Sequence, residues 1–184
     1  MNTNRSAIDP MPEYFDRYIN LVDDISLRDA FDRSIEQIDA FDTAALDRIG
    51  AAVYEPGKWT VPGILQHITD FERIFGYRSM VYARSAGISP QGIDQDVIAA
   101  NSRAEHRTAR QILADLRAAR LANKALFESF DDEMLSARGL CWKYEMPVLA
   151  IGFTTIGHQI HHFRIIEERY YSLAGETAKG VGND

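Results

Sequence analysis

The sequence predicts an all-α protein folded as a four-helix bundle. Four segments repeat apolar residues at helical spacing, three of them begin at a helix-capping signal, and no segment shows the alternation of a strand. These segments cover residues 26–41, 60–84, 108–130 and 147–171. Helices with one apolar face each are stable when those faces meet in a shared core.

The first long helix is predicted to begin at Ser26, because Ser26-Leu27-Arg28-Asp29 has the form of a capping box. Before it, residues 13–24 place aromatic and aliphatic side chains three and four apart, which predicts a short packing helix. Helical character fades after residue 41, although 43–49 is compatible with another turn or two.

The second long helix follows a turn in which Pro56 and Gly57 suit the central positions of type II. Thr60 is placed to cap the helix, and Pro62 is harmless in its first turn. A histidine among apolar residues is more often a core residue than a ligand. Here one histidine shares the inward face with five large apolar side chains: Ile64, His67, Ile68, Phe71, Ile74 and Phe75.

Residues 86–107 form a long connection that contains Gly87, Pro90 and Gly92, with a helical stretch at 94–100. Connections of this length often cross from one end of a bundle to the other. The third helix then begins at a capping box, Thr108 to Gln111. Its apolar face includes Asn123, and the basic stripe opposite that face is predicted to be solvated.

The last helix is predicted to open with Pro147 at its first position, after a linker at 131–144. The domain organisation that follows is a flexible N-terminus at 1–12, a bundle domain at 13–173 and a flexible tail at 174–184. One face of the last helix carries Thr155, His158, Gln159, His162, Ile165 and Ile166.

The composition narrows the class of protein. Twenty basic against 27 acidic residues give a net charge of −7, which disfavours nucleic acid or an anionic membrane as a partner. The single cysteine, Cys141, excludes an internal disulfide and fits a reducing compartment. Neither a signal peptide nor an apolar run of about 20 residues is present. These features predict a cytoplasmic protein.

Three of the five histidines fall within residues 157–163. His158 and His162 are four apart, so a helix stacks them on one face, and His67 faces inward from another helix. Burying imidazoles without partners costs about 1–3 kcal/mol each, and one divalent metal would satisfy all three. Three neutral histidines with open positions are typical of a catalytic metal site.

Other candidates have weaker support. His161 could chelate with His158, but it points about 100° away from His162, so we expect it at the rim of the site or at a helix contact. Asp70 is a candidate outer partner for a ligand, whereas Glu72 is predicted to be a surface or interface charge. We expect His106 to be exposed and the thiol of Cys141 to be unreactive. The two tryptophans, Trp59 and Trp142, are expected to pack as core or wedge residues.

Three motifs lie in order along the chain: Tyr54-x-Pro56-Gly57-Lys58-Trp59-Thr60, Leu65-x-His67-Ile68-x-Asp70-x-Glu72 and Gly157-His158-x-x-His161-His162. Together, across about residues 14–171, they resemble the DinB-like superfamily. The resemblance implies an up-down-down-up bundle with a long connection between the second and third helices. It also implies a homodimer and a nickel or zinc ion bound by three histidines, which are His67, His158 and His162 here.

Members of that superfamily include metal-dependent hydrolases, thiol S-transferases that attach a low-molecular-weight thiol to electrophiles, and a thiol-dependent isomerase. The resemblance therefore implies a metal-dependent enzyme acting on small molecules, with a thiol cofactor in the transferase case. Two alternatives stay open. The metal could staple the bundle or be buffered or sensed, or the protein could be a stress-related dimerisation module whose histidines are polar core residues.

Overall fold

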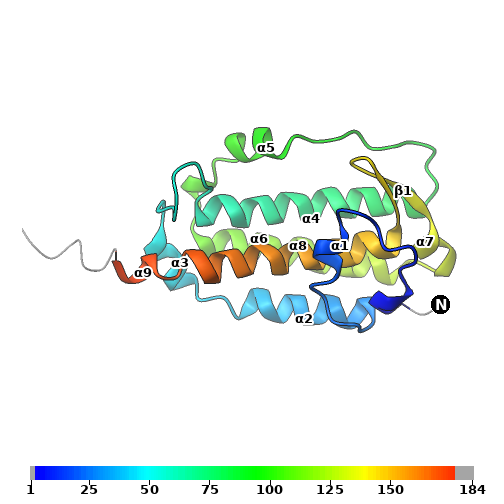
Figure 1. The fold of residues 1–184 in the computed structure, drawn as a ribbon, viewed down its shortest axis with the longest axis horizontal. Helices are drawn as coiled ribbons and strands as arrows, with labels where there is room; N and C mark the ends of the chain where they lie inside the picture. The colour runs from blue at the N-terminus through cyan, green and yellow to red at the C-terminus, as the bar shows by residue number, and fades with distance from the viewer. Residues whose placement is uncertain (1–2, 177–184) are drawn as a thin grey trace, which may run out of the picture.

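The computed structural model describes residues 3–176. Four long helices lie side by side, and they confirm the predicted all-α four-helix bundle (Figure 1). They are α2 (Leu27–Asp39), α4 (Val61–Ala83), α6 (Ala109–Glu128) and α8 (Val148–Arg169).

The order of directions along the bundle is up-down-down-up, as expected. Figure 1 shows α2 and α8 running one way and α4 and α6 the other. The two central helices are parallel because the long connection between them returns along the outside of the bundle, and it contains α5 (Gln95–Asn101) and the 3-10 helix η2 (Ala104–His106). As a result α4 packs against both α6 and α8, which places His67 beside the helix of the other two inward histidines.

The helix starts form as the sequence predicts. Ser26, Thr60 and Thr108 each accept, at the side-chain oxygen, the backbone N–H of the residue three positions on. The turn before α4 is of type II, with Gly57 at a φ of 82°, a conformation that glycine adopts without strain. These local signals fix where α2, α4 and α6 begin.

A layer of buried polar side chains separates two apolar clusters, one toward each end of the bundle. In α2, Ser34 lies between Phe31 of one cluster and Ile38 of the other. In α8, His158 and Gln159 occupy the corresponding place. Because buried polar groups need partners, this layer is where hydrogen bonds or a ligand must compensate for lost water.

Glu72 lies in this polar layer, so its predicted surface or interface position is wrong. Its side chain is 1% exposed and accepts two hydrogen bonds from Arg120, from Nε at 2.9 Å and Nη2 at 2.7 Å. Asn123 donates to the same carboxylate at 2.8 Å, and its predicted place in the core is confirmed. A carboxylate can be buried here because α6 supplies a cation at the same level.

The segment expected to be a linker without strands contains α7 (Asp132–Ser136) and a hairpin. Strand β1 (Arg138–Cys141) pairs antiparallel with β2 (Tyr144–Pro147), and Cys141 stands opposite Tyr144. Four-residue strands are too short for an alternating pattern to be recognised. The last helix begins at Val148, with Pro147 as its N-cap residue rather than its first helical residue.

Shorter elements complete the fold. The helix predicted at 13–24 is only α1 (Asp16–Ile19), whereas 43–49 forms α3 (Thr43–Ile49) as expected. The N-terminal segment before α1 contains the 3-10 helix η1 (Arg5–Ala7), and Ile8 in this segment is buried. The chain continues into α9 (Leu173–Glu176), and the rest of the predicted tail, 177–184, lies outside the described residues. Within 3–176 no helix has both the length and the apolarity for a membrane crossing.

Candidate metal centre

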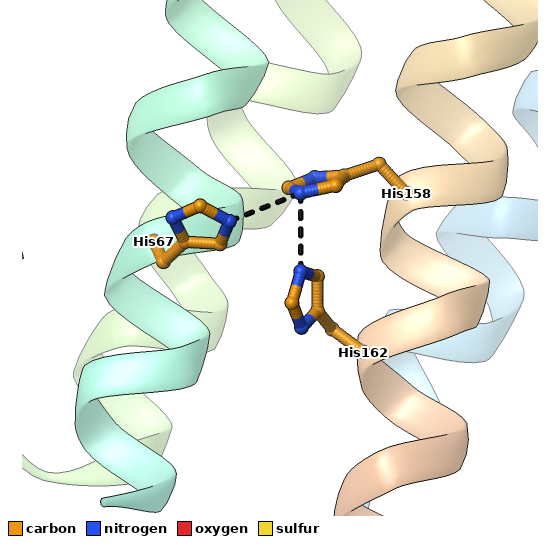
Figure 2. A group of neighbouring side chains, drawn as sticks. All are labelled: His67, His158 and His162. Atoms are coloured by element: carbon orange, nitrogen blue, oxygen red, sulfur yellow. Dashed lines mark hydrogen bonds between the residues drawn. The ribbon is translucent and has the colours of Figure 1, made fainter. Parts of the chain in front are cut away.

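The structure brings His67, His158 and His162 together. His67 lies on α4, and the other two lie one turn apart on α8 (Figure 2). The Nε2 atom of His158 is 3.0 Å from that of His67 and 3.1 Å from that of His162. One nitrogen from each ring lies within 4.8 Å of the others, so the three residues are close enough to share one ion.

A glycine lets another segment approach this part of α8. A Cβ atom on Gly157 would lie 2.0 Å from the backbone oxygen of Tyr18, so any side chain there would displace α1. The close approach sets the Tyr18 ring edge-on against His158 and His161, with 5.4 Å between centroids in each case. Gly157 therefore supports the position of the neighbouring histidine through α1.

Aromatic side chains hold the imidazoles in place. The ring centroid of His67 lies 4.7 Å from that of Trp59 and 4.6 Å from that of Phe71. His158 packs against Phe71 at 5.6 Å as well as against Tyr18. Ring packing of this kind restricts rotation of the ligands and keeps their surroundings apolar.

Burial keeps the three histidines neutral near pH 7. It lowers the pKa of His67 to about 4. Burial, with a smaller effect of His67 and His161, lowers the pKa of His162 to about 2. The pKa of His158 is also well below its ordinary value, chiefly through burial. Neutral imidazole has a free nitrogen lone pair, which is the form that binds metals.

The contacts between the rings leave a hydrogen-bonding deficit that a cation would remove. A nitrogen of neutral imidazole is either one donor or one acceptor, yet Nε2 of His158 faces two other ring nitrogens. Nδ1 of His162 is also buried without a hydrogen-bond partner among the described residues, but an ion bound at Nε2 of that ring would not supply one. A divalent ion would take up all three converging lone pairs, and an all-imidazole donor set suits zinc or nickel.

The remaining predicted residues lie outside the cluster. His161 is partly buried against Tyr18, which matches the rim or helix-contact position expected for it. Asp70 accepts a hydrogen bond from Gln66 at 2.8 Å, and no bond joins it to the three histidines within residues 3–176, so the suggested outer partnership is not formed. His106 is exposed, as expected.

A pocket of about 270 Å³ opens beside His158, and sequence reasoning missed it. We call it the aromatic pocket; its lining includes Tyr14, Tyr18, Phe71, Phe75, Arg78 and Trp142. Trp142 is 61% exposed on the hairpin turn, so its predicted core or wedge position is wrong. The pocket is assembled from α1 and the residues before it, α4, the long connection, the hairpin and α8, so no single stretch of sequence contains its pattern.

Cys141 also lines the aromatic pocket. Burial raises the pKa of its thiol to about 11, partly offset by the nearby charge of Arg78. A protonated thiol is a poor nucleophile at neutral pH, which agrees with the inert role expected from the sequence.

Comparison with known proteins identifies relatives of the fold. The family model of the DinB superfamily matches residues 16–166. A solved structure, YfiT from Bacillus subtilis, aligns with a TM-score of 0.59 and 16% sequence identity, covering 94% of this chain and 90% of that one. It is described as a probable metal-dependent hydrolase with an unusual four-helix bundle topology. No curated protein matches the chain at a significant level. Because the family model spans most of its length, the chain belongs to the DinB superfamily.

Proposed function

We propose that the protein is a metal-dependent enzyme that acts on small molecules. The convergence of three neutral Nε2 atoms beside an open pocket carries this proposal. The description of YfiT as a probable metal-dependent hydrolase supports hydrolysis as the first reaction to test. A closed structural zinc site, in contrast, usually has four protein ligands, often including cysteine.

In this proposal His67, His158 and His162 hold a divalent ion, nickel or zinc. Such an ion with open positions supplies Lewis acidity and lowers the pKa of a coordinated water or thiol. The aromatic residues around His67 and His158 keep bulk water away from the imidazoles. The aromatic pocket gives a small substrate access to the side of the site where His158 lies.

The finer choice is between hydrolase and thiol S-transferase. Both use the same three ligands, and they differ in whether water or a low-molecular-weight thiol attacks the substrate. The resemblance to the superfamily supports either reaction. The two are separated by one requirement, since a transferase consumes thiol and electrophile together whereas a hydrolase needs no thiol.

The metal comes first in the test. Elemental mass spectrometry of untagged protein is compared with a variant in which His67, His158 and His162 are all alanine. The matched control is His106→Ala, which removes an exposed histidine. We expect about one nickel or zinc per chain in the wild type and the control, and none in the triple variant. Absence of metal from the wild type, after both ions have been offered, would overturn the proposal.

The activity assay then uses metal-loaded protein with a panel of esters and amides, and separately with thiols and electrophiles. Turnover that requires the three histidines identifies the reaction class. Stoichiometric metal without any turnover favours the alternative, a non-catalytic metal-binding protein. We also propose the homodimer that the resemblance implies, which light scattering on the purified protein tests directly.

A further inference from the structure

The aromatic pocket runs along one face of α4, away from the histidine cluster. Phe71, Phe75 and Arg78 follow His67 at intervals of four, four and three residues, so successive turns place them on one side of the helix. Eleven residues span about 16 Å along a helix axis. A molecule in this pocket could therefore contact aromatic rings while it extends from the metal site toward Arg78.

Two large aromatic residues at the pocket have unusual backbone conformations. Tyr14 has a φ of 66° and Trp142 a φ of 57°, values that bulky residues rarely adopt. Their ring centroids lie 5.0 Å apart, and both side chains are exposed. Strain of this kind often occurs at ligand sites, and exposed rings are favourable where they cover a bound apolar group. With Phe71 and Phe75 on α4, the lining suits a flat ring.

Arg78 adds a positive charge without a counter-ion. It is 6% exposed, yet no carboxylate in the described chain lies within ion-pair distance of it, and no acidic residue lines the pocket. Nη1 donates to the carbonyls of Pro90 and Leu140 at 3.2 and 2.9 Å, and Nη2 donates to that of Gln91 at 2.6 Å. These bonds use three of the five N–H groups of the guanidinium.

The comparison with Arg120 shows what Arg78 lacks. Arg120 is buried too, and a carboxylate compensates its charge through two hydrogen bonds. A buried cation held only by carbonyls remains uncompensated, so an anion that reaches it gains a strong interaction. Two more cations lie against aromatic rings that line the pocket, since Arg17 lies 3.6 Å from the ring centroid of Tyr14 and Lys143 lies 4.7 Å from that of Trp142.

We propose that the aromatic pocket binds a planar aromatic molecule that carries an anionic group, with the ring among Tyr14, Trp142, Phe71 and Phe75 and the anion at Arg78. Such a molecule would be the substrate of the proposed metal site, and this part of the inference rests on the proposed function. Binding itself requires only the pocket, so it is measured on protein freed of metal with a chelator. That choice also prevents the anion from binding to the metal instead.

Titration calorimetry compares three probes: 2-naphthoate, its neutral analogue 2-naphthamide, and cyclohexanecarboxylate, an anion without a flat ring. We expect 2-naphthoate to bind at least about tenfold more tightly than either of the others. Trp142→Ala should lower the affinity for 2-naphthoate about tenfold, since stacking of a flat ring on one aromatic side chain contributes about that much to binding. The matched control is Tyr77→Ala, which removes an exposed aromatic of α4 that does not line the pocket.

Arg78 also joins the hairpin to the long connection through its hydrogen bonds. Its variant is therefore judged on the ratio of the affinities for 2-naphthoate and 2-naphthamide. In Arg78→Gln the preference for 2-naphthoate over 2-naphthamide should disappear, with the affinity for 2-naphthamide kept to within about threefold. If Arg78 acts only as a structural tie, both probes weaken equally, and the proposed anion site is wrong. Equal binding of all three probes by the wild type, or an unchanged affinity in Trp142→Ala, would overturn the aromatic site.

These results are independent of the metal test. A protein that takes up no metal but prefers 2-naphthoate supports the pocket and contradicts the metalloenzyme. A protein that takes up one metal per chain but shows no preference among the probes supports the metal site and contradicts the proposed aromatic anion site.

Discussion

Glu72 and Arg120 form a doubly hydrogen-bonded ion pair at the centre of the bundle, and all four long helices meet around it. Arg120 of α6 also donates to Ser34 of α2 at 2.6 Å and to the carbonyl of Thr155 of α8 at 3.3 Å. Glu72 comes from α4. The pair therefore connects the polar groups of the layer that contains the histidines.

Removal of one partner should destabilise the fold strongly. Glu72→Ala leaves Arg120 as an uncompensated buried charge, and we expect a loss of about 3–5 kcal/mol in the free energy of unfolding. The control is Asp23→Ala, which breaks an exposed pair with Arg33 and should cost less than about 1 kcal/mol. Urea unfolding of metal-free protein measures both, and equal losses would contradict the structural role of the pair.

A side chain at Gly157 should disturb the contact between α1 and α8. Gly157→Ala places a methyl group 2.0 Å from the Tyr18 carbonyl oxygen, and backbone atoms cannot yield as a flexible side chain can. We expect a loss of about 1–3 kcal/mol in unfolding free energy, together with lower metal occupancy. Gly92→Ala is the stability control, because an added Cβ there meets nothing within 4 Å. Identical melting curves for the two variants would argue against the close approach.

His161 should be dispensable for metal binding. Its ring packs on Tyr18 and its nitrogens lie outside the three-residue cluster. His161→Ala is therefore expected to retain about one metal per chain, whereas His162→Ala, one position on, should lose it. Elemental analysis of the two purified variants decides between them. The reverse result would mean that His158 and His161 form the chelating pair.

Cys141 should react slowly with alkylating agents. Since burial raises its pKa to about 11, only about one thiol in a thousand is a thiolate at pH 8. We expect the rate of iodoacetamide labelling to be much lower in folded protein than in urea, and to rise with pH above 8. Mass spectrometry follows the reaction. Fast labelling of the folded protein would show that the thiol is accessible and ionised, and would reopen its role as a nucleophile.

The parts of the fold that sequence predicts are those set by local chemistry. Capping residues and apolar periodicity place the long helices, because both act within one or two turns of the chain. The three histidines could be chosen in advance since each lies on an inward face, and the structure brings those faces together.

The rest depends on how one helix is rotated against another. Glu72 looks like a surface charge until α6 is placed beside α4 with Arg120 at the same level. The aromatic pocket likewise needs Tyr14, Phe71 and Trp142 from three separate segments. Its positive φ values at Tyr14 and Trp142 are also invisible in a sequence, because those residue types do not favour them.

The proposed metal ligands come from distant parts of the chain, which sets when each is synthesised. His67 and His158 are separated by 91 residues, so a ribosome adding about 5–20 residues per second makes them roughly 5–20 seconds apart. The nascent chain has only one of the three histidines until α8 emerges. Metallation would then be a late event, and a translation product truncated before α8 would leave the ribosome without the means to take up the ion.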